Sequence, residues 1–450
     1  MPYEELAEST ELELVDLAAI LLRVCRSRVD ALLHGLEDDA AFVALGEARD
    51  QARDFFRASQ LDVFEKDRLQ ELIALLKCLE ADIERKTKTP SFALPLAARA
   101  VAEALDDVHG HQFALQFRDR EPRPLGDGDP IPVLQPPLKA LLRAPLVSRR
   151  ESCGPMLEEL RRLRLLPPLM GGYSVVVDAS HNDVLADLEP ESRLAVIVTG
   201  SIDDLEWDCV EGQLPSFFGV RPRDPEAKRA LTLGLLEKAE EAGARIVVLP
   251  ELCLDGESVD AVEQWYRERR RSCSVLVCGS VHVDGKDGRR NVCSTFLAGG
   301  GRVEHWKYNP VEMRLKADSS TVYREGIRAA PRRITLHLSG DWSFTTLICK
   351  DLLEPETVRV LTALQVRMVL VPALSRKTGL FRDKAVALCG DAQAIVLVAN
   401  QWGTADADPE PAAAILARPL EARPYELRSF PEKGSGLEVF TLAGDSTGFT

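Results

Sequence analysis

The sequence lacks any long hydrophobic run. No stretch of its 450 residues approaches the roughly 18 to 20 consecutive apolar residues that a membrane-spanning helix needs. The opening segment, MPYEELAEST, also lacks the basic region and the apolar core of a secretory signal. Because both features are missing, we expect a cytoplasmic protein with no membrane partner.

Positive charge is scarce as well. The 56 lysines and arginines are outnumbered by 71 aspartates and glutamates, which gives a formal net charge of −15 at pH 7. Such a charge repels phosphate backbones, so no nucleic-acid partner is expected. The ten cysteines contain no C-x-x-C pair, which argues against a zinc site or a disulfide framework. We therefore expect no metal and interpret most of the cysteines as reduced core residues.

Three regions differ in pattern, as expected for a chain too long for one ordinary core. Residues 1–118 carry apolar side chains at helical spacing, as in LQELIALLKCLEADI, and predict a helical domain without a catalytic cluster. Pro90 and Pro95 predict a break before the last helix of this domain. Residues 119–190 are interpreted as a proline-rich linker and connector. Residues 191–450 form the remaining domain.

Short apolar runs recur in this last domain. Examples are LAVIVTG, RIVVLPEL, FTTLICKD and VLVPAL, and helical patterns separate several of them. Runs of about four to eight residues rich in β-branched types and bounded by turns are typical of buried strands. The domain is therefore predicted to be α/β, with a layered sheet covered by helices. No G-x-G-x-x-G follows the first strand, which argues against a dinucleotide cofactor.

Three of the predicted strands end in reactive residues. Glu251 follows RIVVLP, Lys307 follows a hairpin that carries EHW, and Cys349 follows FTTLI just before a predicted helix. Taken singly, each is explained by packing or solvation. Taken together they are a thiol nucleophile, a carboxylate base and a fixed cation, which suffice for acyl transfer. No histidine is required.

The same residues lie in motifs that resemble those of the nitrilase, or carbon–nitrogen hydrolase, superfamily. RIVVLPELCLDG is similar to the motif of its general base, NVCSTFLAGGGRVEHWK to that of its lysine, and ICKDLLEPETVR to that of its nucleophile. The resemblance covers residues from about 190 to 450 and follows the superfamily's order. It implies a four-layer α-β-β-α sandwich, here preceded by an all-α region, and association into homodimers or larger assemblies.

The resemblance also assigns roles. It places the base on Glu251, the lysine on Lys307 and the nucleophile on Cys349, with the backbone N–H of Lys350 in the oxyanion hole. It implies hydrolysis of a non-peptide carbon–nitrogen bond, in an amide or carbamoyl group or in a nitrile, through a thioester-type acyl-enzyme. Amides are preferred because most branches of the superfamily cleave them. Neither a metal nor an organic cofactor is implied.

Three positions match the resemblance less closely. A second glutamate that helps to position substrate is expected a few residues after the lysine, and Glu312 is favoured over Glu325. Lys350 stands where an aromatic residue is frequent, so it either favours an acidic substrate or faces solvent. Residues 404–424 carry four prolines in place of the segment that usually follows the last strand.

Two other interpretations remain open. A nitrilase-like domain without catalysis would serve as an oligomerisation platform for an N-terminal helical domain that binds a protein partner. A glutaminase would instead supply ammonia to a partner enzyme. We favour catalysis, because a scaffold does not need all three reactive side chains.

Overall fold

The chain forms two compact units. The structure is a computed structural model that describes residues 2–58, 63–133, 159–167, 172–210, 216–314, 321–401, 412–419, 424–429 and 434–443. The first unit holds the described residues up to 167, and the second holds those from 172 onward. Within these ranges, no helix is both long and apolar enough to cross a membrane. Much of the proline-containing stretch 404–424 lies outside the described residues.

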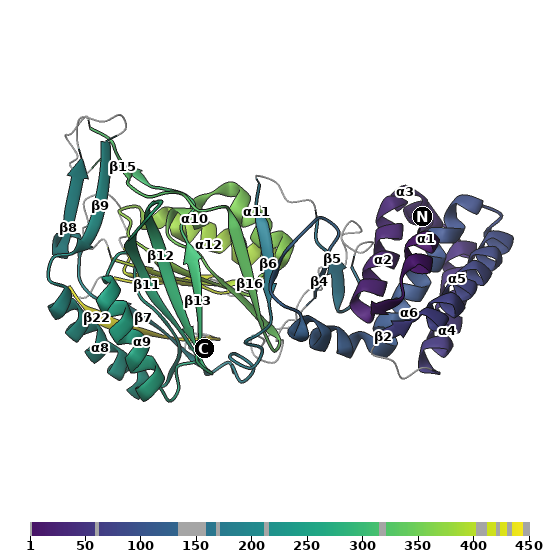
Figure 1. Cartoon of the computed structure of the whole chain (residues 1–450), viewed down its shortest axis with the longest axis horizontal. Coiled ribbons are helices and arrows are strands. Elements are labelled where there is room, and N and C mark those ends of the chain that lie inside the picture. The colour runs from purple at the N-terminus through teal and green to yellow at the C-terminus, as the bar shows by residue number, and fades with distance from the viewer. Residues whose placement is uncertain are drawn as a thin grey trace, which may run out of the picture. The chain divides into compact units, whose positions relative to one another are not determined.

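The first unit is mainly helical (Figure 1). Its helices are α1 (Pro2–Glu8), α2 (Leu14–Ser27), α3 (Val29–Glu37), α4 (Asp39–Arg57), α5 (Lys66–Thr87) and α6 (Pro90–Asp119). Its short strands are β1 (Glu11–Glu13), β2 (Val63–Glu65), β3 (Arg123–Leu125), β4 (Pro130–Pro132) and β5 (Leu163–Leu165). β1 pairs with β2 and β4 with β5, both antiparallel. The helical character expected for the N-terminal region is confirmed, with these short strands in addition.

Helix α6 is the centre of the first unit. It contacts α2, α3, α4 and α5, and many of its buried residues are alanines, whose small side chains let several helices approach closely. The expected break between Pro90 and Pro95 is wrong, because α6 begins at Pro90 and continues through Pro95. Proline at the first helical position sacrifices no hydrogen bond, and packing on several sides outweighs the bond lost at Pro95.

The second unit contains two large sheets. The first has the strand order β13-β12-β11-β10-β7-β22, and β7, β10 and β11 are parallel. Helices α8 (Pro225–Glu241) and α9 (Gly256–Arg269) pack on it. Its strands are β7 (Arg193–Val198), β10 (Ala244–Val248), β11 (Val275–Gly285), β12 (Gly288–Leu297), β13 (Gly301–Trp306) and β22 (Gly436–Thr441).

The second large sheet faces the first. Within this unit its order is β21-β20-β19-β18-β17-β16-β6. Its strands are β6 (Ser174–Asp178), β16 (Arg333–Ser339), β17 (Trp342–Thr346), β18 (Met368–Ala373), β19 (Ile395–Asn400), β20 (Ala414–Ala417) and β21 (Tyr425–Arg428). The helices on this side are α10 (Lys350–Leu353), α11 (Pro355–Leu364) and α12 (Thr378–Ala392), and α12 packs on β19 and β20. Because β10 and β11 contact β18 while β7 contacts β19, the predicted four-layer α-β-β-α sandwich is confirmed.

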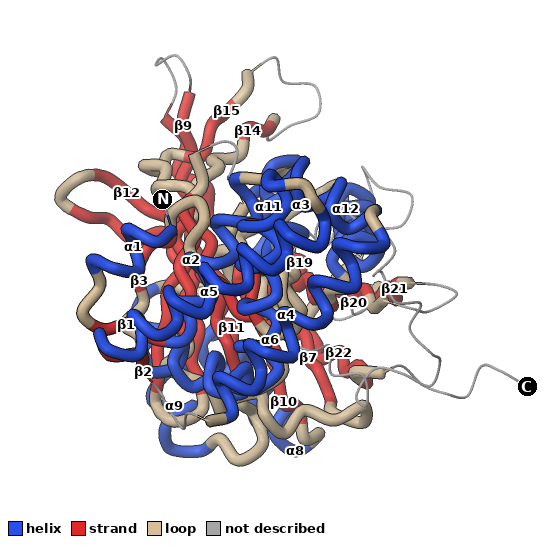
Figure 2. The backbone as a smooth tube through the Cα atoms, turned by 90° about the vertical axis from the view of Figure 1, so that its right-hand side faces the viewer, coloured by secondary structure: helices blue, strands red, loops and turns tan. Residues whose placement is uncertain are grey.

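A small third sheet lies at one end of this unit (Figures 1 and 2). Its order is β14-β15-β9-β8, with β9 and β15 parallel. Its strands are β8 (Leu205–Val210), β9 (Ser216–Pro222), β14 (Glu312–Met313) and β15 (Tyr323–Glu325), and a short 3-10 turn, Ile202–Asp204, precedes β8. Its apolar side chains, including Phe218 and Tyr323, form one cluster with Leu252 and Leu374, which lie beside the strand ends of the two large sheets.

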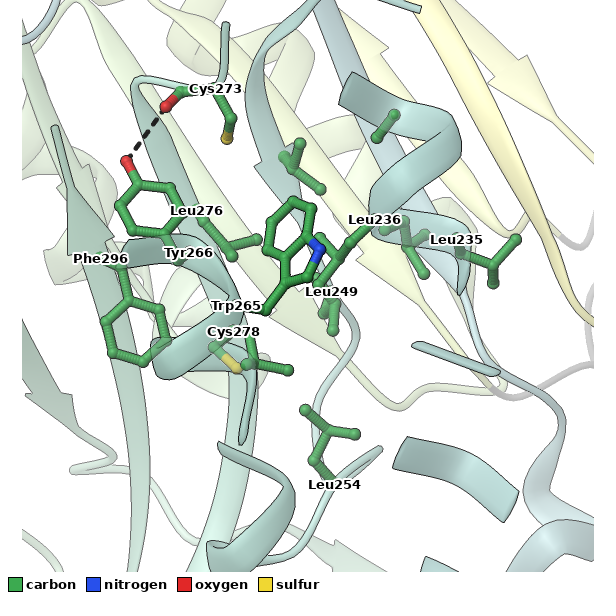
Figure 3. Close-up of a cluster of buried hydrophobic side chains, with 14 of the residues drawn as sticks. Leu235, Leu236, Leu249, Leu254, Trp265, Tyr266, Cys273, Leu276, Cys278 and Phe296 are labelled. Atoms are coloured by element: carbon green, nitrogen blue, oxygen red, sulfur yellow. Dashed lines mark hydrogen bonds between the residues drawn. The ribbon is translucent and has the colours of Figure 1, made fainter. Parts of the chain in front are cut away.

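Local sequence explains why α8 and α9 begin where they do. The side chain of Asp224 accepts a hydrogen bond from the Ala227 N–H, and that of Asp255 accepts one from the Ser258 N–H. Both helices then bury one face against the first large sheet, as Figure 3 shows for Leu236 of α8 and Trp265 of α9, for example. This core holds the strands whose ends carry the candidate site.

A glycine allows β11 to approach the segment that carries Glu251. Gly279 has φ +68°, and a Cβ atom there would lie 2.2 Å from the carbonyl oxygen of Pro250. The next residue, Ser280, forms a bridge with Glu251 and accepts a hydrogen bond from the Leu252 N–H. Only a residue without a side chain fits this backbone and this contact.

We predict that Gly279→Ala lowers the free energy of unfolding by at least about 2 kcal/mol, because it combines a strained φ with a clash against backbone. Urea unfolding followed by tryptophan fluorescence measures this in the second unit, since all five tryptophans lie between positions 207 and 402. The matched control is Gly234→Ala on α8, where a Cβ meets nothing within 4 Å and a gain of up to about 1 kcal/mol is expected. Equal urea midpoints for Gly279→Ala and the parent would contradict the prediction.

Candidate active site

Neighbouring carbonyl groups of one strand hold Glu251 and Cys349 in place. Glu251 follows β10 in the first large sheet, and Cys349 lies between β17 and α10 in the second. The Glu251 N–H donates to the carbonyl oxygen of Ala373 at 3.3 Å, and the Cys349 N–H donates to that of Pro372 at 2.8 Å. Because Pro372 and Ala373 are consecutive on β18, one strand brings these two residues together from opposite sheets.

Lys307 joins Glu251 through a buried ion pair. Lys307 follows β13, and its N–H donates to the carbonyl oxygen of Asn291 on β12 at 2.9 Å. Its Nζ donates to Glu251 Oε1 at 2.7 Å, and the two side chains are only 1% and 2% exposed. In such a dry site the attraction between the charges is much stronger than in water.

Glu325 completes the charge arrangement. Its Oε2 accepts hydrogen bonds from Lys307 Nζ at 2.6 Å and from the Val311 N–H at 3.1 Å. Its Oε1 accepts from Asn291 Nδ2 at 2.8 Å and contacts His282 Nε2 at 3.1 Å. Asn291 Nδ2 also donates to Glu251 Oε1 at 2.9 Å. One ammonium and one amide therefore lie between two buried carboxylates.

The second glutamate at Lys307 is thus Glu325, and the preference for Glu312 requires correction. Glu312 lies exposed on β14, opposite Arg324 of β15. The chain leaves the site after Lys307 and returns along β15, where Tyr323 and Glu325 are buried and Arg324 is exposed. Distance along the sequence does not reveal this return. The signal available was the alternation of β15, which places Glu325 on the same face as a buried tyrosine.

Sequence analysis also missed Asn291 and His282. Asn291 is the first residue of the motif NVCSTF, which was used only to locate the lysine. His282 lies in the apolar run SVLVCGSVHV, where one polar residue gives little reason to expect a partner. Both side chains meet the site because β11 and β12 pair with His282 opposite Asn291.

The two carboxylates differ in their affinity for a proton. Burial raises the pKa of Glu251, and the nearby charge of Glu325 adds to this, although Lys307 opposes it. Burial also acts to raise the pKa of Glu325, but Lys307 and His282 outweigh it and hold that pKa well below its usual range. Burial acts to lower the pKa of Lys307, but the two carboxylates hold it well above its usual range. Glu325 therefore stays ionised, and Glu251 is the carboxylate suited to accept a proton.

Cys349 occupies a strained turn between strand and helix. Its φ is +48° and its ψ −109°, a conformation that residues with a side chain rarely adopt outside functional sites. The residue is 4% exposed, and its Sγ lies 3.9 Å from the carbonyl oxygen of Leu374. Burial and the charge of Glu251 raise the thiol pKa well above its usual value, while Lys307 lowers it. The thiol is therefore protonated at rest and needs a base to become a nucleophile.

Asp351 connects the loop around Lys307 to the turn that begins at Cys349. It is fully buried, its Oδ2 contacts His305 Nε2 at 3.0 Å, and its Oδ1 accepts from the Asn309 N–H at 2.9 Å. Burial raises the pKa of Asp351, and the nearby His305 opposes this. Because His305 and Asn309 flank Lys307, this carboxylate holds both sides of the lysine against the turn that begins at Cys349.

The side chain of Lys350 is directed at the same loop. Its Nζ donates to the carbonyl oxygen of Pro310 at 3.1 Å. This contact adds a second link between the turn that begins at Cys349 and the segment after Lys307. In the described ranges, no group of three or more His, Cys, Asp or Glu side chains is arranged to hold a metal ion.

Similar solved structures include those of an amidase from Nesterenkonia sp. AN1, a member of the nitrilase superfamily, to which the three motifs are also similar. The amidase is 19% identical over 55% of this chain and 91% of its own, with a TM-score of 0.38. A mutant of this amidase in complex with butyramide is 19% identical over 55% of this chain and 90% of its own, with a TM-score of 0.38. Another mutant, which carries the acetamide moiety of fluoroacetamide at the active-site cysteine, is 19% identical over 55% of this chain and 89% of its own, with a TM-score of 0.38. No family model and no curated protein matches the chain.

We predict that Asn291→Asp destabilises the second unit by roughly 3 kcal/mol at pH 7.5, because it places a third carboxylate beside Glu251 and Glu325. The pKa of the new carboxyl is raised on folding. Its penalty is therefore absent below the unfolded pKa of about 3.9, grows as the pH rises, and is complete above the folded pKa.

Urea midpoints at pH 5 and pH 7.5 measure this effect through tryptophan fluorescence. The control is Asn182→Asp, since Asn182 is not fully buried and its Oδ1 only accepts a bond from the Gly340 N–H, which aspartate retains. The explanation fails if Asn291→Asp is as stable as the parent at pH 7.5, or equally destabilised at both pH values.

Proposed function

We propose that the chain is a cysteine-dependent hydrolase of a small non-peptide carbon–nitrogen bond, with amides as the preferred substrates. The observation that carries this proposal is the meeting of three buried groups beside β18: the Cys349 thiol, the Glu251 carboxylate and the Lys307 ammonium. Acyl transfer requires a charged Lys307, which the two carboxylates favour, and a carboxylate base for the protonated thiol, and the charge of Lys307 acts to lower the pKa of Glu251.

The first half of the reaction forms an acyl-enzyme. Cys349 Sγ attacks the carbonyl carbon of the amide while Glu251 takes the thiol proton. The oxyanion of the tetrahedral intermediate is stabilised by Lys307 Nζ and by the backbone N–H of Lys350. Glu251 then gives its proton to the leaving nitrogen, ammonia or an amine departs, and a thioester remains on Cys349.

The second half of the reaction consumes water. Glu251 takes a proton from a water molecule as its oxygen attacks the thioester carbonyl, and Lys307 again stabilises the oxyanion. Collapse of this intermediate releases the carboxylic acid, and the proton returns to the Cys349 sulfur. Glu325 takes no proton in either half, since its four contacts stabilise the ionised form.

Two features support a small substrate. Cys349 is 4% exposed, so a folded polypeptide cannot reach its sulfur. The apolar cluster of the third sheet includes Leu252 and Leu374, the residues next to Glu251 and next to the β18 carbonyl groups. Apolar walls beside a few polar groups are typical of small-molecule sites.

We predict that iodoacetamide labels Cys349 faster than Cys389, a buried cysteine whose Sγ lies 3.0 Å from the carbonyl oxygen of Ala394, with Glu251 in the role of base for Cys349. Glu251→Gln should slow the labelling of Cys349 at least about tenfold. Exposed Cys78 is the internal control and should label at the same rate in both proteins. Peptide mass spectrometry over time gives all three rates. Labelling of Cys349 that ignores Glu251→Gln would count against the proposed base.

We further predict ammonia release from a panel of short aliphatic amides, N-carbamoyl compounds, nitriles and L-glutamine. Cys349→Ala should abolish release, and Glu251→Gln should lower kcat/KM by about 10² to 10⁴-fold. Release from L-glutamine alone would establish the glutaminase interpretation. If no compound is hydrolysed and Cys349 labels no faster than Cys389, the oligomerisation platform takes precedence.

A further inference from the structure

His282 forms a bridge between the third sheet and the charged centre of the site. It lies on β11, and its side chain is 5% exposed. Its Nδ1 accepts a hydrogen bond from the Val220 N–H of β9 at 3.1 Å. A ring nitrogen that accepts a bond carries no proton, so the proton of the neutral ring is on Nε2. That nitrogen lies 3.1 Å from Glu325 Oε1 and donates to it.

Strand β9, which donates to His282, also holds the backbone of Glu325. β9 and β15 pair in parallel with Glu325 opposite Phe218, and the Gly326 N–H donates to the Phe218 carbonyl oxygen at 2.8 Å. The β8–β9 hairpin therefore holds Glu325 twice, through the backbone at Phe218 and through the imidazole between Val220 and Oε1.

We infer that His282 is a positioning residue for the proposed hydrolase. Its neutral imidazole bridges the Val220 N–H and Glu325 Oε1, and it thereby fixes the carboxylate that orients the Lys307 ammonium. This inference rests on the proposed function, because that function assigns Lys307 the stabilisation of an oxyanion. It assigns no proton transfer to His282. The requirement is one acceptor at Nδ1 and one donor at Nε2.

Several charged groups share the surroundings of His282. Glu325 faces it from β15, and Asn291 on β12 links that carboxylate to Glu251. Asp284, on the same strand as His282, pairs with Arg289 of β12 at 2.8 Å. Loss of the bridge leaves these groups in place and removes one donor from Glu325, so the carboxylate binds a proton more readily.

Two substitutions separate a bridge from a titrating group. His282→Gln keeps one amide oxygen to accept and one N–H to donate, whereas His282→Leu has similar bulk and neither. We expect His282→Leu to lower kcat/KM about 10- to 100-fold and to move the acidic limb of its pH profile to higher pH. We expect His282→Gln to stay within about threefold of the parent, with an unchanged acidic limb.

Labelling of Cys349 by iodoacetamide between pH 5 and pH 9 tests the same bridge without a substrate. His282→Leu should slow Cys349 at least about fivefold relative to Cys78 in the same molecule, and His282→Gln should not. If no amide is hydrolysed, the proposed function fails. The labelling rates of Cys349 in His282→Leu and His282→Gln still show by themselves whether the bridge matters.

The inference is overturned if His282→Leu keeps the parent pH profile and labelling rate, or if His282→Gln is impaired as strongly as His282→Leu. Urea unfolding of each variant by tryptophan fluorescence shows whether it is folded. If His282→Leu does not fold, His282→Gln decides: parent-like kinetics support the bridge, and a tenfold loss overturns it.

Discussion

The burial of one ammonium between two carboxylates is the constraint on which the rest of the site depends. Lys307 is 1% exposed, and its charge would be very costly in that position without Glu251 at 2.7 Å and Glu325 at 2.6 Å. The two carboxylates in turn exceed the charge of a single lysine, so further donors have to be supplied. Asn291 serves both carboxylates, while His282 and a backbone N–H serve Glu325 alone. Burial raises the pKa of Glu251, whereas Lys307 and His282 hold that of Glu325 well below its usual range against the same effect of burial.

The sandwich supplies this arrangement because each participating group lies at the end of a strand or on a paired strand. β18 faces the first sheet and offers consecutive carbonyl groups to Cys349 and Glu251. Asp351 then holds the loop around Lys307 against the turn that begins at Cys349, through His305 and Asn309. The strained φ of Cys349 and the close approach at Gly279 are local costs of this convergence, and the core beneath α8 and α9 offsets them. The third sheet contributes Glu325 and fixes its backbone by pairing β15 with β9.

Reasoning from the sequence located candidate residues most directly at the ends of predicted strands. Glu251 and Cys349 each follow an apolar run, and Lys307 follows a hairpin strand that carries EHW. The structure brings all three side chains to one place, while their roles stay predictions. Reasoning from the sequence was wrong for Glu312, because the return of the chain along β15 depends on pairing with the β8–β9 hairpin, a contact between segments about a hundred residues apart. His282 was missed for a related reason, since its partners come from β9 and β15. The uninterrupted α6 was missed because packing on several sides, which local sequence does not display, overrides the effect of Pro95.

The resting protonation of the site follows from the same burial that makes it costly. Removal of water raises the pKa of both the Cys349 thiol and the Glu251 carboxyl, because it disfavours the charged form of each. The thiol therefore keeps its proton until a partner stabilises the negative charge that loss of the proton creates. The dry core around Lys307 therefore does more than hold a cation, because the charge that it leaves unscreened acts on both groups and opposes the rise of each pKa.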